Sequence, residues 1–187
     1  MISIARSLTA AVAVAALATL SSPAFAEKPK WADKSDSTIV EFAVGASGEP
    51  FDLDANGEDF DILVAALLTT GVVGVFDGTD YTVFAPNDQA FYDLTGTTND
   101  TDALNAVVGL IGVDGVAAVL AYHVTDGVRN SRSVVRAKQI SMFDGNSINY
   151  DSAVGLIMAN QSAAGLLNID NRLADGMVHV IDTVLLP

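Results

Sequence analysis

Hydrophobic and polar positions divide the chain into a helical first part and a β-rich second part. The strongest helical pattern has apolar residues at the i, i+3, i+4, i+7 and i+8 positions of one face: Phe60, Leu63, Val64, Leu67 and Leu68. Asp59 precedes this face as the expected N-cap, and Gly71 follows it where a left-handed residue ends many helices. The pattern predicts a buried helix with one apolar stripe.

Shorter elements surround this helix. Residues 38–44 form an apolar run compatible with either a helix or a strand, and 45–57 form a loop rich in Gly and Asp. Residues 81–85 favour a strand, which Pro86 ends. Asn87 then caps a short helix that runs through Leu94.

Two more helices are predicted before the texture of the sequence changes. A polar loop at 96–102 leads into helices at 103–110 and 116–122, with Asp114 as the cap of the second. From Val124 onward, short apolar segments alternate with turn-forming residues.

The second part of the chain therefore reads as β-structure. Ile140 and Met142 alternate with polar residues, as do Ile148 and Tyr150, and the Asp-Gly-Asn turn at 144–146 between them predicts a hairpin. Residues 177–186 are apolar on both faces, which indicates a buried strand. Helices followed by strands favour an α+β fold over βαβ winding.

The N-terminal residues have the pattern of a signal peptide. Arg6 supplies a positive charge, 8–20 form a short apolar run, and the small residues Ala24 and Ala26 frame a cleavage site after Ala26. We expect residues 1–26 to be removed and the mature protein to be secreted or periplasmic, without membrane insertion. Residues 27–37 are polar and of mixed charge, and are expected to form a tail.

Charge and cysteine content narrow the possible partners. The chain has a formal net charge of −14 and no cysteine. A surface this acidic repels nucleic acid and anionic lipid, because both bind through Lys and Arg. Without disulfides, stability must come from a packed core.

Few residues are suited to catalysis. The sequence has two histidines, His123 and His179, and no G-x-S-x-G, H-E-x-x-H or P-loop motif. His179 and Asp182 are three positions apart, so on a strand their side chains point to opposite faces and do not form a dyad. For His123 a buried, hydrogen-bonded imidazole and a partner contact are both considered.

The stretch from Asp52 to Asp61 resembles the first half of a calcium-binding loop. Asp52, Asp54, Asn56 and Glu58 have the spacing of EF-hand positions 1, 3, 5 and 7. Position 12, however, is Leu63, which belongs to the apolar stripe and cannot bind metal. The stretch is either a solvated acidic loop whose last carboxylates stabilise the N-terminus of the following helix, or a weak calcium site whose loop closes differently from an EF-hand.

Three motifs in order resemble the fasciclin-like domain family. Thr82 to Phe91 (TVFAPNDQAF) is similar to the family's first signature, Tyr122-His123 to its central pair, and 175–187 to its closing signature. The motif residues expected to be structural are Thr82, Phe84, Pro86, Asn87, Phe91, Gly176, His179 and Asp182. Together with the opening helix, the resemblance covers about residues 37 to 187.

The resemblance implies a wedge-shaped β-sandwich with packed helices, occupying residues 38–187. It also implies a bacterial extracellular adhesion module without catalytic activity or a required cofactor, which recognises a surface protein or polysaccharide. Tyr122 and His123 are then the expected partner contacts. A calcium-dependent binding module that uses the 52–61 loop is the alternative, and an uncharacterised hydrolase is a third.

Overall fold

The computed structural model describes residues 35–47, 52–72 and 80–187, so the expected signal peptide and most of the expected tail lie outside the described residues. The helices are α1 (Ile39–Ala46), α2 (Asp61–Thr70), α3 (Asp88–Thr95), α4 (Asp100–Ala121) and α5 (Ser131–Arg136). The strands are β1 (Tyr81–Pro86), β2 (Val124–Asp126), β3 (Ile140–Ser141), β4 (Ser147–Asp151), β5 (Leu156–Met158), β6 (Ala163–Ala164), β7 (Leu166–Leu173) and β8 (Gly176–Ile181).

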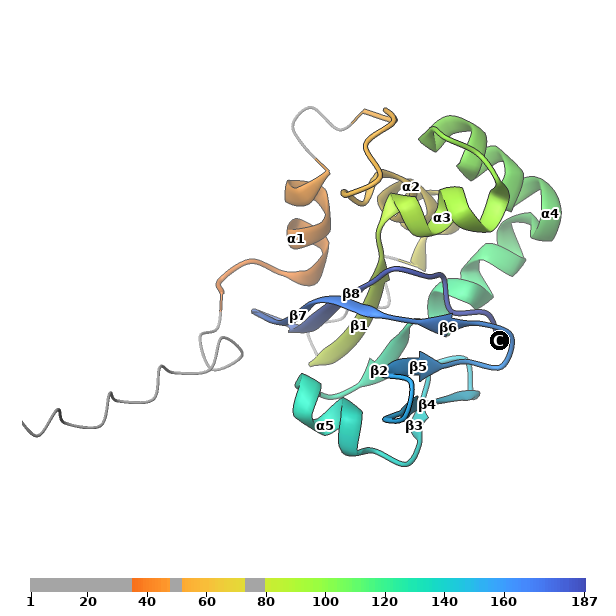
Figure 1. Ribbon diagram of the computed structural model, residues 1–187. Coiled ribbons are helices and arrows are strands. Elements are labelled where there is room, and N and C mark those ends of the chain that lie inside the picture. The colour runs from red at the N-terminus through yellow and green to blue at the C-terminus, as the bar shows by residue number, and fades with distance from the viewer. Residues whose placement is uncertain (1–34, 48–51, 73–79) are drawn as a thin grey trace, which may run out of the picture.

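The strands form two four-stranded sheets. The first has the order β2-β1-β8-β7 and the second the order β3-β4-β5-β6. Only β1 and β8, among the described strand pairs, run parallel, with Tyr81 opposite Gly176 and Pro86 opposite Ile181. Helices α1 to α4 lie on one side of the first sheet, and the second sheet with α5 lies on the other (Figure 1). The predicted α+β sandwich with packed helices is confirmed.

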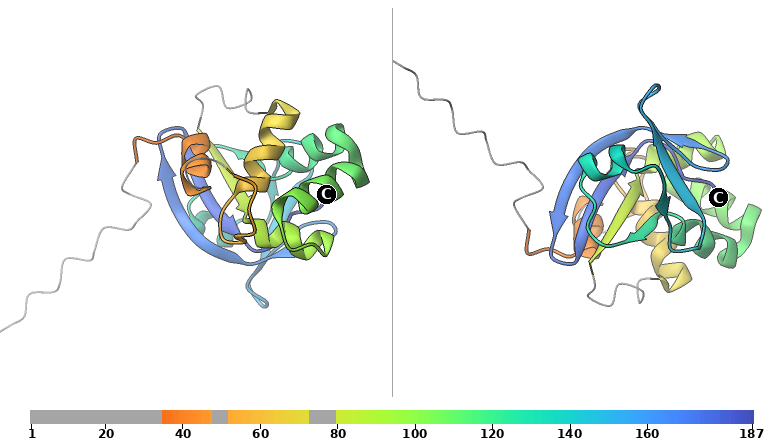
Figure 2. Two further views of the ribbon diagram at one scale, coloured as in Figure 1. Left: turned by 90° about the horizontal axis from the view of Figure 1, so that it is seen from above. Right: turned by 90° about the horizontal axis from the view of Figure 1, so that it is seen from below.

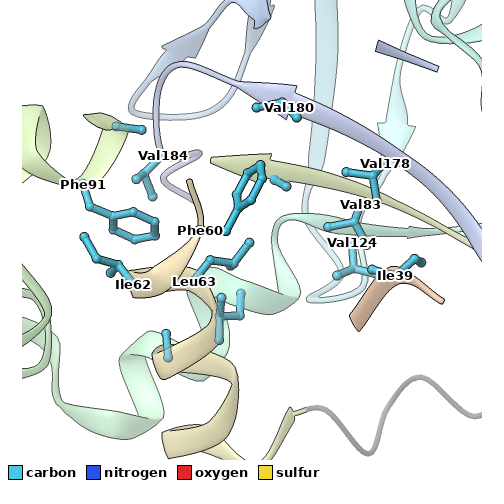
Figure 3. Packing of buried hydrophobic residues seen from close by; sticks show 14 of the residues in the cluster. Ile39, Phe60, Ile62, Leu63, Val83, Phe91, Val124, Val178, Val180 and Val184 are labelled. Carbon is cyan, nitrogen blue, oxygen red and sulfur yellow. The ribbon is translucent and has the colours of Figure 1, made fainter. Parts of the chain in front are cut away.

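The central strands β1 and β8 are buried along their whole length because both faces of the sheet are covered. Val83 and Val178 belong to the core on the helical side, whereas Phe84 and Ile181 belong to the core between the sheets. Figure 3 shows the helical-side core, where Leu63 of α2 lies among the same group of buried side chains. Successive side chains of a strand point to opposite faces, so alternate side chains of the TVFA segment pack into the two cores.

Side-chain caps set where α1 and α3 begin, whereas the predicted cap of α2 is absent. Thr38 forms a capping box with Glu41, which selects the helix for the apolar run at 38–44. Asn87 caps α3 as predicted, through a bond from Ala90 N to Asn87 Oδ1 of 3.2 Å. Asp59 does not cap α2: the N-cap position is Phe60, which makes no side-chain cap bond.

The predicted apolar stripe of α2 is correct only in its first half. Leu63 and Val64 are buried, but Leu68 is 66% exposed. Ile62, which lies off the stripe, is 1% exposed. The buried residues of α2 run continuously from Asp61 to Ala66, because the start of the helix is enclosed on all sides while its end, at Gly71 (φ 69°), projects outward.

Helix α4 contains the predicted interruption. Gly112 has φ 69° and ψ 172°, so two helical segments meet there, and Asp114 lies inside the second segment instead of capping it. The first segment starts earlier than predicted, because Asn99 accepts a bond from Asp102 N (2.9 Å) and caps residues assigned to a loop. Of the described helices, α4 is by length and composition apolar enough to cross a membrane, a property that core helices of soluble proteins share.

The β-rich part contains the predicted hairpin, with Ile140 opposite Ile148. Helix α5 was not predicted; it is a short helix of 6 residues capped by Asn130. The last strand was predicted too long, since β8 ends at Ile181. At the sheet edge, β7 curves around the domain (Figure 2), and its pairing with β8 shifts register twice, as bulged strands do.

Gly176 allows the first pairing step between β1 and β8, which gives a test of this packing. A Cβ at this position would lie 2.2 Å from Tyr81 O and 2.7 Å from Ile39 Cδ1. We expect Gly176→Ala to lower the free energy of unfolding by about 1–3 kcal/mol, the usual cost of overpacking. Urea denaturation measures this loss.

The matched control is Gly109→Ala in α4, where a Cβ would meet nothing within 4 Å. This change should raise the free energy of unfolding by about 0.5–1 kcal/mol through helix propensity. Equal stabilities of the two variants would contradict the close approach at Gly176.

Candidate functional site

Three helices begin at one place, and each begins with an aspartate. Asp61, Asp88 and Asp100 are the first residues of α2, α3 and α4, and all three are 0% exposed. The loop before α2 holds the helix starts together: Asp88 N donates to Asp59 O (3.1 Å), and Asp100 N donates to Asp54 O (3.1 Å). Backbone carbonyl groups of this loop thus accept hydrogen bonds from the first amides of two helices.

The carboxylates of this region lie close enough to share a cation. Oxygens of Asp54, Asp61 and Asp100 lie within 4.8 Å of one another, and so do oxygens of Asp59, Asp61 and Asp88. Asp61 belongs to both groups. We call these five residues the aspartate cluster.

Hydrogen bonds satisfy only part of the aspartate cluster. Asp88 accepts from Asp61 N (2.8 Å) and Ile62 N (3.0 Å), so it is the side chain that caps α2. Asp100 Oδ1 accepts from the Tyr92 hydroxyl, 2.5 Å away. Both oxygens of Asp61, one of Asp59 (Oδ1) and one of Asp100 (Oδ2) are buried without a hydrogen-bond partner in the described residues.

No basic side chain in this part of the sequence neutralises the cluster. The chain has no Lys or Arg from residue 35 to residue 128. Burial, together with the neighbouring Asp59 and Asp100, raises the pKa of Asp61 to about 6. Burial and a hydrogen bond with Asp59 raise the pKa of Asp88 to about 9, and burial raises that of Asp100.

Ser47 lies beside Asp61, and a hydrogen bond from its hydroxyl would lower the pKa of Asp61. Its hydroxyl proton, however, is donated to Ala43 O at 3.0 Å. A hydroxyl has one proton to donate, so the Asp61 oxygens receive none from Ser47.

The four predicted calcium ligands of the 52–61 loop do not lie together in the structure. Of Asp52, Asp54, Asn56 and Glu58, only Asp54 has an oxygen in the two carboxylate groups of the described residues. Asn56 Oδ1 accepts from Glu58 N (3.2 Å) instead. Leu63, at EF-hand position 12, is 5% exposed in the core, as expected.

Sequence reasoning missed Asp88 and Asp100 as members of this cluster. The available signal was that each follows an asparagine cap and opens a helix, which usually means interaction with its own helix terminus. Their convergence depends on how α2, α3 and α4 pack, which local sequence does not specify.

Tyr122 and His123 are core residues. The Tyr122 hydroxyl donates to Ser147 O (3.0 Å), and its side chain is 0% exposed. His123, 2% exposed, bonds Val119 O through Nδ1 (2.7 Å) and accepts from Leu185 N through Nε2 (2.9 Å). The partner contact through these side chains stays a prediction, and their burial counts against it.

His179 and Asp182 are separate, as their spacing predicted. His179 accepts from Asp170 N (3.2 Å), bonds Arg129 O (2.8 Å) and stacks on Phe84. Asp182 instead accepts from Gly165 N (2.7 Å). His179 therefore connects β8 to β7 and to the backbone at Arg129, whereas Asp182, directly after β8, binds the backbone between β6 and β7.

Thr82 has a structural role on the neighbouring strand. Its hydroxyl donates to Gly127 O (2.7 Å) and accepts from Arg129 N (2.8 Å), so it fastens the turn after β2. Phe91, from the same motif, is 5% exposed in the helical-side core. These contacts agree with the structural role expected of the first signature.

The two sheets, the helices on one face and the buried motif residues define an α+β module without an exposed imidazole among its described residues. The family model described as "Fasciclin domain" matches residues 58–187. The chain belongs to the fasciclin domain family, whose domains are generally adhesion or binding modules of cell-surface proteins.

Several known proteins are similar to this chain. Protein sll1483 of Synechocystis sp. is 29% identical over 157 residues, covering 83% of this chain and 77% of that protein. Transforming growth factor-beta-induced protein ig-h3 of Sus scrofa is 28% identical, covering 75% of this chain. Cell surface glycolipoprotein MPB83 of Mycobacterium bovis is 30% identical, covering 62% of this chain.

The similarity extends over only part of some relatives. The chain spans 19% of ig-h3 and 48% of MPB83. Among solved structures, a FAS1 domain pair from the insect cell adhesion molecule Fasciclin I matches with a TM-score of 0.57 at 15% identity, covering 81% of this chain and 51% of that one. This match supports the fold.

The environment of His123 predicts a pH dependence of stability. Burial lowers the pKa of His123 from 6.5 to about 4. Below pH 6.5 the unfolded chain takes up a proton that the folded protein does not, so the contribution present above pH 6.5 is lost as pH falls toward 4. Between pH 7 and pH 5 this loss should be about 2 kcal/mol.

His123→Gln removes the titrating group and serves for comparison. The variant should be less stable than the parent at pH 7, and the difference should shrink by about 2 kcal/mol at pH 5. Chemical denaturation at both values measures it. A difference independent of pH would contradict a neutral, buried His123.

Proposed function

We propose that this protein is an extracellular, non-catalytic binding module that recognises a protein or polysaccharide partner at a cell surface or in a matrix. Membership of the fasciclin domain family carries the proposal. The names of two similar proteins point the same way: MPB83 is a cell surface glycolipoprotein, and Fasciclin I is an insect cell adhesion molecule. The signal-like pattern of residues 1–26 supports export.

The chemistry of the described residues favours binding over catalysis. Both imidazoles are buried, and each makes two hydrogen bonds within the fold. A general base must reach its substrate through a hydrogen bond or one water, which burial of His123 and His179 prevents. Hydrolysis would therefore need a different base.

Partner contacts must come from exposed side chains, and two exposed regions differ in character. At the interruption of α4, Leu110 is 78% exposed and is flanked by exposed Ile111. On α5, Arg132 and Arg136 are exposed, within an otherwise acidic protein. Apolar and basic side chains contribute differently to recognition, so variants in these regions can locate the contact surface.

The proposal predicts saturable binding of the mature protein to cells or to extracted matrix, measured with labelled protein. Tyr122→Phe should lower the thermal midpoint, because Ser147 O loses its donor, yet leave the affinity of the folded protein unchanged. Background binding at all concentrations would contradict the proposal.

Surface variants locate the contact once binding is seen. Leu110→Glu and the double variant Arg132→Glu/Arg136→Glu change the two regions without touching the buried cores. Loss of affinity in one variant, with an unchanged thermal midpoint, assigns the contact to that region. Crosslinking on the same cells then identifies what is captured.

A further inference from the structure

We propose that the aspartate cluster is a Ca²⁺ site in which Asp54, Asp61 and Asp100 bind the ion and Asp59 lies beside it. The site differs from an EF-hand, because its carboxylates come from a loop and from the first residues of two helices. It goes beyond the binding function proposed above and stands on separate observations.

The unpartnered oxygens of Asp61 and Asp100 carry this inference. Both residues are 0% exposed, and the Asp61 carboxylate has no donor at either oxygen. A buried carboxylate without a partner is costly, so such groups are normally hydrogen-bonded, protonated or bound to a cation. One carboxylate oxygen each of Asp61, Asp100 and Asp54 lies within 4.8 Å of the other two.

Helix N-termini do not supply the missing donors. The amides of Asp61 and Ile62 donate to Asp88, that of Asp88 to Asp59 O, and that of Asp100 to Asp54 O. Each helix start contributes about half a positive charge, so three of them offset about +1.5. Even without Asp88, which caps α2, the four other aspartates carry −4 when ionised, so the cluster remains negative.

The ligand chemistry selects a hard cation. All candidate ligands are carboxylate oxygens, and both histidine side chains of the sequence are hydrogen-bonded within the cores. Ca²⁺ binds oxygen at about 2.3–2.6 Å with flexible geometry, so ligand oxygens up to about 4.8 Å apart can share one ion. Mg²⁺ requires about 2.0–2.1 Å and a nearly ideal octahedron, and it dehydrates reluctantly, so it suits a buried group of protein carboxylates less well.

The position of the cluster gives the ion both access and a structural effect. Asp54 is exposed, so it connects the buried carboxylates to solvent and leaves room for water ligands. A bound ion would join the 52–60 loop to the starts of α2 and α4. These elements already meet through the bond from Asp100 N to Asp54 O, which Ca²⁺ would reinforce.

The test is isothermal titration of chelator-treated mature protein with CaCl₂ at pH 7.5. We expect one ion per chain with a dissociation constant of about 10⁻⁴ to 10⁻³ M, the range of extracellular modules. The thermal midpoint should rise by several degrees in about 5 mM Ca²⁺ relative to chelator, since only the folded chain presents the site.

Asp61→Asn is the decisive variant and Asp114→Asn its control. Asn at position 61 removes an unpaired buried charge, so the variant should fold in chelator while losing both the titration heat and the Ca²⁺-dependent midpoint shift. Asp114 is exposed on α4, and its variant should behave as the parent. Asp100→Asn repeats the test on a second helix.

Three results would overturn the proposal. The first is no binding heat and no midpoint shift up to about 10 mM Ca²⁺. The second is an unchanged response in Asp61→Asn, which would place the ion elsewhere. The third is an equal response to Mg²⁺, which would indicate charge screening. None of these readouts uses a partner, so they are independent of the adhesion assay.

Discussion

The parallel pairing of β1 with β8 is the constraint on which the rest of the fold depends. It joins residues 81–86 to residues 176–181, and these two strands separate the helical core from the core between the sheets. Because β1 and β8 lie far apart in the sequence, neither core is complete until both strands are in place. Such non-local contacts slow folding but couple the layers into one cooperative unit.

Hydrogen bonds of the two histidine side chains connect segments that lie beside this central pair. His123 connects the end of α4 to the C-terminal segment at Leu185, and His179 connects β8 to the turn at Arg129 and to the β7 bulge at Asp170. Asp170 adopts a positive φ of 63° there and also accepts from Ser131 at the start of α5. Both imidazoles serve as neutral donor–acceptor pairs, which explains why burial suits them and why exposed residues must provide recognition.

The sequence predicted the features that local patterns encode. The TVFAP strand, the Asn87 cap, the hairpin across the turn at 144–146 and the separation of His179 from Asp182 all follow from spacing and turn chemistry. The misassigned α2 cap had a physical cause, since Asp88 supplies that cap from another helix. Tyr122 and His123 are likewise buried by tertiary packing, which the local sequence does not specify.

In the aspartate cluster, the packing of three helices creates a need to neutralise buried carboxylates, and no local sequence motif predicts this need. Each aspartate at a helix start is individually favourable, because the helix terminus is partly positive. When α2, α3 and α4 bring their starts together, the amides are consumed by backbone carbonyls and by Asp88, and the remaining carboxylates repel one another. Protons can relieve the repulsion, as the raised pKa values of Asp61 and Asp88 indicate. A divalent cation would relieve the repulsion without proton uptake. The packing of the three helix starts therefore favours binding of Ca²⁺, as proposed above.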